Sequence, residues 1–422
     1  MIHLLALAAS IAFVPLDDRP VAAQLPPMLG RIAGVTVDTP AAPLLGRYLQ
    51  AGQSDQIVAW LGAQARRPEA NAFVVSTDML SYGGLIASRV PDVAYAGAAF
   101  RLRTLSRIRA NKPSAWIAGF ATVMRLAPTG IPAGTPFFAA DPAWRLLQQY
   151  ANLPQPVPAS DAQTERDLRT QLGPVLNDYL ATRERDLGVD RLLLQLTAQG
   201  TIDRLAIGQD DAGPVGLHVN EVAQLRQIVA NDPSFGGRVS IEPGADELGM
   251  ALVAQAIART AGWTPHVRVV YSTPSGALTQ DPLEFAPISV AIDGLIGLCG
   301  GVRDDGRPDL ALFVRVPKTT PQEDGALSAA MTASLAAGTP VALADLTFLN
   351  DDQYASQAAF AKNILATGLA SRLDAYASWN TNANTVGTAL AEAVAAGAGR
   401  RRGTYDDLAH RTFTFMRFLD DY

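Results

Sequence analysis

Short apolar runs that end in polar residues recur along the chain, and helix-like segments separate them. Nine such runs, rich in Val, Ile, Leu and Phe, lie at 11–16, 72–75, 116–123, 204–207, 239–241, 267–271, 310–316, 340–344 and 373–377. Continuous apolar runs of this length are typical of parallel strands that are buried on both faces. Helical spacing appears between and after them, at 53–64, 95–110, 164–186, 220–231, 247–261, 326–337, 353–365, 385–396 and 405–421. This alternation predicts an α/β fold with right-handed crossovers.

The number of predicted strands favours a (β/α)8-like barrel, modified by an extra strand or hairpin. Two doubly wound parallel-sheet domains are the alternative. No linker divides the chain, so we expect a single α/β domain of catalytic type over 11–422. Residues 128–158 are rich in Pro, Gly and aromatic residues, and an amphipathic segment follows them. This pattern predicts a helical insertion after the third strand, near 128–190, that forms a lid or an added subdomain.

The N-terminus and the overall composition bear on location and partners. The first ten residues, MIHLLALAAS, resemble the remnant of a secretory signal, which favours export to the periplasm or the medium over a cytoplasmic location. The alternative is that they extend the first strand. No later stretch holds eighteen uninterrupted apolar residues, so we expect no membrane span. The net charge of −6 argues against a general nucleic-acid binder, and the single Cys299 excludes an internal disulfide.

Acidic and amide residues follow the apolar runs. In α/β folds, ligands bind beyond the carboxyl ends of the strands, so these side chains are expected to converge on one face. For any single carboxylate the alternative is a helix N-cap, because an aspartate accepts hydrogen bonds from free backbone N–H groups. The residues concerned are Asp17, Asp18, Asp78, Asp210, Asp211, Asp246, Glu247, Trp379 and Asn380.

Asp246 and Glu247 form the sharpest of these clusters. They stand side by side after a predicted strand, and Gly244 permits a tight turn before them. Adjacent buried acids repel each other, so the pKa of one should rise and that group should keep its proton. A carboxylic acid beside a carboxylate is the pair that glycosidic bond cleavage uses. The alternative is that Asp246 caps the following helix and Glu247 completes its first turn.

Asp210 and Asp211 form a second pair of adjacent acids at a strand end. They could bind sugar hydroxyls, supply a second carboxylate, or hold Mg²⁺ or another divalent cation through oxygen ligands. The alternative is an Asx-turn that leads into the next helix. The spacing matches no metal motif, so no metal ligands are assigned and no cofactor is expected.

The remaining strand ends supply candidates for substrate binding. Asp17, Asp18 and Arg19 follow the first predicted strand, Asp78 and Tyr82 the second, and Arg125 the third. An arginine among acids either fixes a loop or binds a ligand oxygen pair in bidentate fashion. Trp379, Asn380 and Asn384 follow the last strand, where an indole gives an apolar platform and amides bind hydroxyls. The alternative places Trp379 in the core and uses the Asn residues as helix caps.

Two resemblances to known families can be drawn from these motifs. The segment Gly244–Glu247 resembles the Asp-Glu pair of substrate-assisted N-acetylhexosaminidases, which implies that Asp246 orients an acetamido group and Glu247 is the general acid. The whole chain resembles the bacterial family catalogued as domain of unknown function 4127. The motifs that carry this resemblance are FVPLDDRP at 13–20, STDMLSYGGL at 76–85, QDD at 209–211, PGADE at 243–247 and WNT at 379–381. Membership over 11–422 is implied, and the family name implies no activity.

The sequence therefore predicts a glycosidase-like hydrolase of a carbohydrate or amino-sugar conjugate. Glu247 is the expected general acid, with Asp246, Asp210 or Asp211 as its carboxylate partner. Two alternatives stay open: a non-catalytic protein that binds a sugar or another metabolite, and a hydrolase assisted by Mg²⁺ or Mn²⁺ at the Asp pairs. In each case the expected partner is a small molecule or a glycan.

Overall fold

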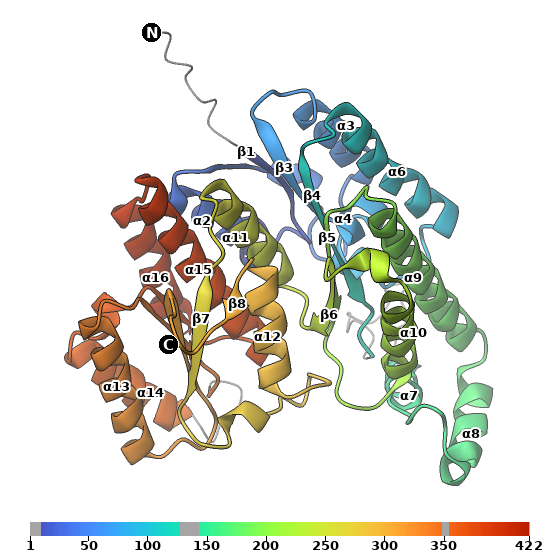
Figure 1. Ribbon diagram of the computed structural model, residues 1–422. Coiled ribbons are helices and arrows are strands. Elements are labelled where there is room, and N and C mark those ends of the chain that lie inside the picture. Colours follow the sequence, from blue (N-terminus) through green and yellow to red (C-terminus); the bar gives the residue numbers. More distant parts are fainter. Residues whose placement is uncertain (1–9, 127–142, 348–353, 422) are drawn as a thin grey trace.

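The computed structural model describes residues 10–126, 143–347 and 354–421, whose strands form two parallel sheets. The first sheet has the order β2-β1-β3-β4-β5-β6 (Figure 1). Its strands are β1 (Ser10–Val14), β2 (Thr36–Asp38), β3 (Ala70–Ser76), β4 (Trp116–Val123), β5 (Arg204–Gln209) and β6 (Val239–Pro243). The second sheet has the order β11-β10-β9-β7-β8. Its strands are β7 (His266–Tyr271), β8 (Val302–Arg303), β9 (Leu310–Arg315), β10 (Val341–Asp345) and β11 (Ala375–Ala377).

The two sheets repeat one strand order. In each, the first strand lies between the second and the third, and later strands add on the side of the third. This is a doubly wound order, in which the chain reverses direction across the sheet beside its first strand. Neither sheet closes on itself within the described residues. The strand pairing therefore matches the alternative of two doubly wound sheets, and the single (β/α)8-like barrel that was our first expectation is not seen.

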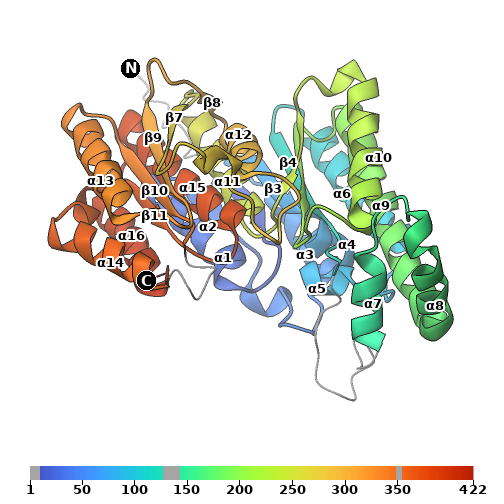
Figure 2. The same cartoon turned by 90° about the horizontal axis from the view of Figure 1, so that it is seen from below.

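Helices cover both faces of each sheet (Figures 1 and 2). The outer face of the first sheet carries α3 (Ser54–Gln64), α6 (Tyr95–Asn111), α9 (Pro174–Ala198) and α10 (Leu217–Asn231). Between the sheets lie α2 (Leu25–Ala33), α11 (Leu248–Thr260), α12 (Ile288–Leu298) and α15 (Asn382–Arg402). The second sheet is covered on its other side by α13 (Pro321–Ala336) and α14 (Tyr354–Ala366), and α16 (Asp407–Asp421) packs beside β11. Short helices α1 (Pro20–Ala23), α4 (Thr77–Tyr82) and α5 (Leu85–Ser88) follow strands of the first sheet.

One apolar core fills the space between the sheets. Along β1, Ile11 and Phe13 face this central core, whereas Ala12 and Val14 face the outer helices. Along β9, Leu312 belongs to the same central core. Both faces of the strands are thus buried, which is why their sequences are continuously apolar. The helices between the sheets bind the two halves of the chain into one packed body.

A helical segment connects β4, which is the third of the predicted strands and the fourth in the structure, to β5. It consists of α7 (Ala143–Ala151), α8 (Ala162–Leu172) and α9, and it has a small core of its own that includes Leu147, Leu172 and Tyr179. The amphipathic pattern at 164–186 spans α8 and α9, which are separated at Gly173 because its φ of 52° lies in the left-handed region. Part of the predicted insertion and most of the predicted signal remnant, residues 127–142 and 1–9, lie outside the described residues.

The carboxyl ends of the second sheet are closed by side chains. Arg315, at the end of β9, is fully buried and donates two hydrogen bonds to Asp324, of 2.6 and 2.9 Å. It also donates to Asp345 at the end of β10 (3.2 Å), to Thr347 (2.7 Å) and to Ser356 (2.6 Å). This network occupies the position where an α/β sheet usually binds its ligand. A ligand site is therefore to be sought at the other sheet.

No helix among the described residues is both long and apolar enough to span a bilayer.

Candidate functional site

A polar cleft of about 330 Å³ lies at the carboxyl ends of the first sheet, against the start of α15. It draws residues from the ends of β1, β4, β5 and β6 and from the second half of the chain. Its lining consists of Arg19, Tyr48, Leu85, Ile86, Arg89, Arg125, Asp210, Asp211, Gly244, Ala245, Asp246, Leu283, Glu284, Asn380, Thr381 and Asn384. The structure thus brings together most of the residues that the strand ends predict.

Arg19 links the ends of β1 and β6. Its guanidinium donates to both carboxylate oxygens of Asp246, at 2.9 and 2.5 Å, and its Nε donates to Asp17 at 2.9 Å. Burial raises the pKa of Asp246, and the charge of Arg19 offsets part of that rise. No side-chain hydrogen bond from this carboxylate caps α11, whose N-cap is Glu247. The bidentate pair, not the helix cap, is therefore what holds Asp246.

Two more arginines pair with the acids that follow β5. Arg89 donates to Asp210 in a buried ion pair, and Arg125 donates to Asp211 at 3.4 Å. Burial and the neighbouring Asp210 charge raise the pKa of Asp211 to about 6. Asp211 is one of the few described non-glycine residues with a positive φ, 22°. The helix that follows, α10, has Gly216 as its N-cap. Asp210 and Asp211 therefore line the cleft and do not cap this helix.

Glu284 lines the same cleft, although no pattern in the sequence pointed to it. It lies in the loop before α12, is 1% exposed, and accepts a hydrogen bond of 2.6 Å from the backbone N of Ala383 at the start of α15. Burial raises the pKa of Glu284 to about 8, so the group holds its proton at neutral pH. The loop is joined to the aspartate pair, because Ala212 N donates to Leu283 O at 3.0 Å. A protonated acid and a largely ionised one therefore line the same cleft.

Glu247, our expected general acid, lies beneath the cleft and does not line it. It is fully buried, and its Oε2 accepts from Asn384 Nδ2 at 2.5 Å and from Ala245 N at 3.2 Å. Burial raises its pKa to about 8, so the expectation that one of the two adjacent acids keeps its proton is met. Two glycines make room for it: a Cβ on Gly244 would lie 2.0 Å from Oε1, and one on Gly387 would lie 2.5 Å from Cγ. Glu247 is thus a positioning residue that joins α11 to α15.

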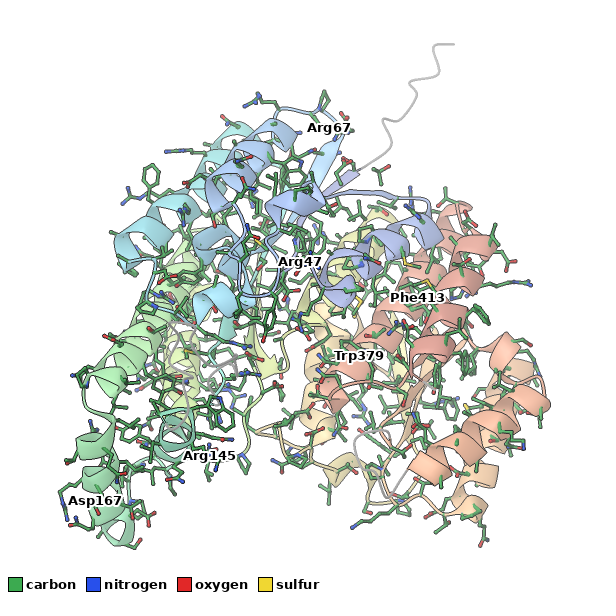
Figure 3. All side chains as sticks on the ribbon, turned by 180° about the vertical axis from the view of Figure 1, so that it is seen from behind. Arg47, Arg67, Arg145, Asp167, Trp379 and Phe413 are labelled. Carbon is green, nitrogen blue, oxygen red and sulfur yellow. The ribbon has the colours of Figure 1, made fainter. Side chains whose placement is uncertain are left out.

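The start of α15 forms the opposite wall. Thr381 is the N-cap and accepts from Asn384 N at 3.3 Å, and Asn380 Nδ2 donates to Asn384 Oδ1 at 2.5 Å. Asn380 has a φ of 57°. Trp379, the predicted apolar platform, is not part of the lining; its indole N–H donates to Thr388 at 3.1 Å and its ring packs on the central core (Figure 3). Trp379 is half-buried at the edge of the core, and Thr381, not an asparagine, caps the helix.

Asp78 and Tyr82 lie behind the cleft, on α4. Asp78 is buried and accepts from Thr122 Oγ1 at 2.9 Å, and burial together with the Asp186 carboxylate raises its pKa to about 8. The ring of Tyr82 is covered by the Arg185 guanidinium at 4.3 Å from its centroid. Neither residue lines the cleft. Asp17 and Asp18 line a neighbouring cavity that shares a wall with it.

Backbone strain is concentrated at this site. Tyr48, Asp211, Lys318 and Asn380 are the non-glycine residues with positive φ among the described residues, and all but Lys318 line the cleft. A left-handed conformation costs a non-glycine residue of order 1 kcal/mol or more and persists where the surrounding structure enforces it. Such residues gather at binding and catalytic sites. The strain therefore marks the cleft independently of its charges.

Comparison with known proteins places the chain in a family. The model of one family, described as a protein of unknown function (DUF4127), matches residues 11–422. The chain belongs to this family. No curated protein and no solved structure matches it. Each of the five motifs that carried the resemblance, FVPLDDRP, STDMLSYGGL, QDD, PGADE and WNT, contributes residues to the lining of the cleft or of the cavity beside it.

No group of three or more His, Cys, Asp or Glu side chains in the described parts of this DUF4127 chain has a geometry that could hold a metal ion. The Asp210 and Asp211 carboxylates face arginines instead. Each guanidinium supplies the positive charge that a divalent cation would otherwise bring to these acids.

The positioning role of Glu247 predicts how stability depends on pH. Between its ordinary pKa of 4.5 and its folded value of about 8, the folded chain keeps a proton that the unfolded chain has lost. The free energy of unfolding therefore falls as pH rises through this range, by about 1.4 kcal/mol per pH unit for one group. Glu247→Gln keeps the neutral shape and removes this loss. We expect the variant to gain stability relative to the wild type from pH 5 to pH 8 in urea denaturation.

The matched control for this experiment is Glu184→Gln, at an exposed position on α9. The difference in free energy of unfolding between Glu184→Gln and the wild type should stay constant from pH 5 to pH 8. A Glu247→Gln difference that is also constant between pH 5 and pH 8 would contradict the protonated, buried state of Glu247.

Proposed function

We propose that this protein hydrolyses a carbohydrate or amino-sugar conjugate by carboxyl acid/base chemistry in the cleft at the first sheet. The observation that carries the proposal is the pairing of Glu284 and Asp211 in one cleft. The pKa of Glu284 is raised to about 8 and that of Asp211 to about 6, so at neutral pH the first is an acid and the second is largely a carboxylate. Two carboxyl groups whose pKa values are set apart on either side of neutrality supply the acid and the base of glycosidic hydrolysis.

In this proposal Glu284 protonates the leaving oxygen and Asp211 activates water or attacks the sugar. Glu284 takes the role that the sequence suggested for Glu247, because Glu284 reaches the cleft and Glu247 does not. Asp246 and Asp210 are held by Arg19 and Arg89, which leaves their outer lone pairs as hydroxyl acceptors. Asn380, Thr381 and Asn384 add amide and hydroxyl groups on the other wall. A cleft whose lining combines several fixed polar groups with apolar side chains such as Leu85 and Leu283 suits a sugar, which has hydroxyl groups and apolar C–H faces.

The same groups could bind a sugar without cleaving it, and the experiment must separate the two. The purified chain is incubated at pH 7 with a panel of aryl and natural glycosides, including N-acetylhexosaminides, and products are followed by mass spectrometry. We expect a reducing sugar to be released from at least one member. A ligand-induced rise in melting temperature with no product from any member would instead support the binding protein. A rate that falls on chelation and returns with Mg²⁺ or Mn²⁺ would favour metal-assisted hydrolysis at the Asp pair.

A further inference from the structure

A mainly apolar groove runs along α10, beside the two loops that carry Glu284 and Asp211. It has a volume of about 600 Å³ and shares no lining residue with the cleft. From Val219 to Ala230 its lining residues recur at helical spacing, so the groove follows one face of α10 for about 16 Å (Figure 1). The lining consists of Pro214, His218, Val219, Val222, Ala223, Arg226, Gln227, Ala230 and Phe285.

Two loops take part in both cavities. They are joined by the hydrogen bond from Ala212 N to Leu283 O, of 3.0 Å. In the loop before α12, Leu283 and Glu284 line the cleft, and the next residue, Phe285, lines the groove. In the loop after β5, Pro214 lines the groove. The candidate general acid therefore lies one residue away from a wall of the groove.

The rim above these loops is apolar. Leu283 is 43% exposed and Val215 is 46% exposed, and Pro214 and Pro282 are exposed as well. The two loops pack closely, because a Cβ on Gly213 would lie 3.0 Å from Pro282 O. These side chains thus form an apolar rim that extends from the polar cleft to the apolar groove, which is a path that a chain of methylene groups can follow.

The polar residues of the groove do not place a free charge at its floor. His218 is buried, and burial together with the Arg183 charge lowers its pKa to about 4, so its ring is uncharged at neutral pH. The guanidinium of Arg226 lies 5.0 Å from the centroid of the Phe285 ring and donates to Ile241 O at 3.1 Å. Its charge is thus held against the ring and the edge of the first sheet, and the valine and alanine side chains are left to contact a ligand.

We propose that the substrate is a sugar conjugate with a long alkyl aglycone, which crosses the rim at Leu283 and lies in the groove along α10. The inference rests on the proposed function and names its substrate class. The cleft holds the sugar, and Glu284 faces the oxygen that joins it to the aglycone. Burial of the alkyl chain supplies affinity at a distance from the bond that is cleaved.

The products of this reaction are the free sugar and a long-chain alcohol. The bond between the anomeric carbon and the leaving oxygen breaks, and the leaving oxygen takes the proton of Glu284. The anomeric carbon takes the hydroxyl group of a water molecule, whose remaining proton goes to Asp211.

The test compares methyl and octyl thioglycosides of one sugar, which resist hydrolysis, by titration calorimetry on the full chain below the micelle concentration. The sugar is the one that the glycoside panel identifies; if the panel gives no product, β-glucosides and N-acetyl-β-glucosaminides are used. We expect the octyl compound to bind at least tenfold more tightly than the methyl compound, which requires burial of about two CH₂ groups.

Variants on the surface of α10 locate the alkyl chain. Ala223→Lys and Ala230→Lys each place a charged side chain in the groove at an exposed position, and each should lower the affinity ratio to near one. Ala329→Lys, at an exposed position of α13, is the matched control and should preserve the ratio.

An octyl compound that binds no more tightly than the methyl compound would overturn the alkyl aglycone and leave the proposed hydrolase standing, because cleavage in the panel is measured separately. A ratio that persists in both Ala223→Lys and Ala230→Lys, or that Ala329→Lys also abolishes, would overturn it in the same way. Binding of no thioglycoside, together with no product in the glycoside panel, would overturn both proposals.

Discussion

Glu284→Gln is expected to lower kcat on a glycoside substrate by roughly 10²- to 10⁴-fold, which is the usual contribution of a general acid. Glutamine has the same shape and can still accept from Ala383 N, but it has no proton to give to the leaving oxygen. The loss should appear in kcat, while KM changes little because the cleft keeps its form. Steady-state kinetics on the substrate found in the glycoside panel measure it. Glu184→Gln, on the exposed side of α9, is the matched control and should keep full activity.

The same pair predicts the shape of the pH profile. Activity needs Asp211 ionised and Glu284 protonated, so kcat/KM should rise through about pH 6 and fall through about pH 8. In Glu284→Gln the residual activity should lose its alkaline limb, and in Asp211→Asn it should lose its acidic limb. If wild-type levels of turnover persist in Glu284→Gln, or if both limbs survive in both variants, the acid and the base lie elsewhere.

Arg315→Met is expected to lower the free energy of unfolding by about 3–5 kcal/mol, the range measured when one partner of a buried ion pair is removed. Methionine fills much of the space but leaves Asp345 fully buried and Asp324 largely buried without their guanidinium. Urea denaturation at pH 7 measures the effect. Arg303→Met, which removes an exposed pair with Asp293, should cost less than about 1 kcal/mol.

A second variant keeps this prediction testable if Arg315→Met does not fold. Combining it with Asp324→Asn and Asp345→Asn removes the uncompensated charges and should recover part of the loss. Equal stability of the Arg315→Met and Arg303→Met variants would show that the network at the second sheet contributes nothing beyond a surface pair.

The strands could be predicted because burial on both faces leaves a continuous apolar run in the sequence. All nine predicted runs overlap strands, and 116–123 coincides with β4. β2 and β8 were missed because they are edge strands of three and two residues whose side chains are exposed or half-buried, and such strands carry no continuous apolar run. α2 was missed because Pro26 and Pro27 occur in its first turn, where proline is tolerated although it reads as a helix breaker. How the strands divide between two sheets depends on long-range pairing that periodicity does not encode.

The candidate site could be predicted as far as strand ends define it. Asp17, Arg19, Asp210, Asp211 and Asp246 do converge, because parallel strands bring their carboxyl ends to one edge. Glu284 could not be found in this way, since it lies in a loop and matters because of its burial. Glu247 was correctly expected to hold a proton, but its side chain turns beneath the cleft between two glycines. Whether a side chain points into the cleft, and how deeply it is buried, depends on how the elements pack. The pattern of residues along the chain does not determine this.

The single core between the sheets has a consequence for how a ligand enters and leaves. Proteins built from two lobes around a cleft often close on their ligand by a hinge, which needs a thin connection between the lobes. Here α2, α11 and α15 fill that region with fully buried side chains. Rotation of one half of the chain against the other would therefore expose these apolar side chains to water. The width of the cleft is thus fixed when the chain folds. Only movements of the surface hairpins and loops that border the cleft can then change how easily a ligand enters or leaves it.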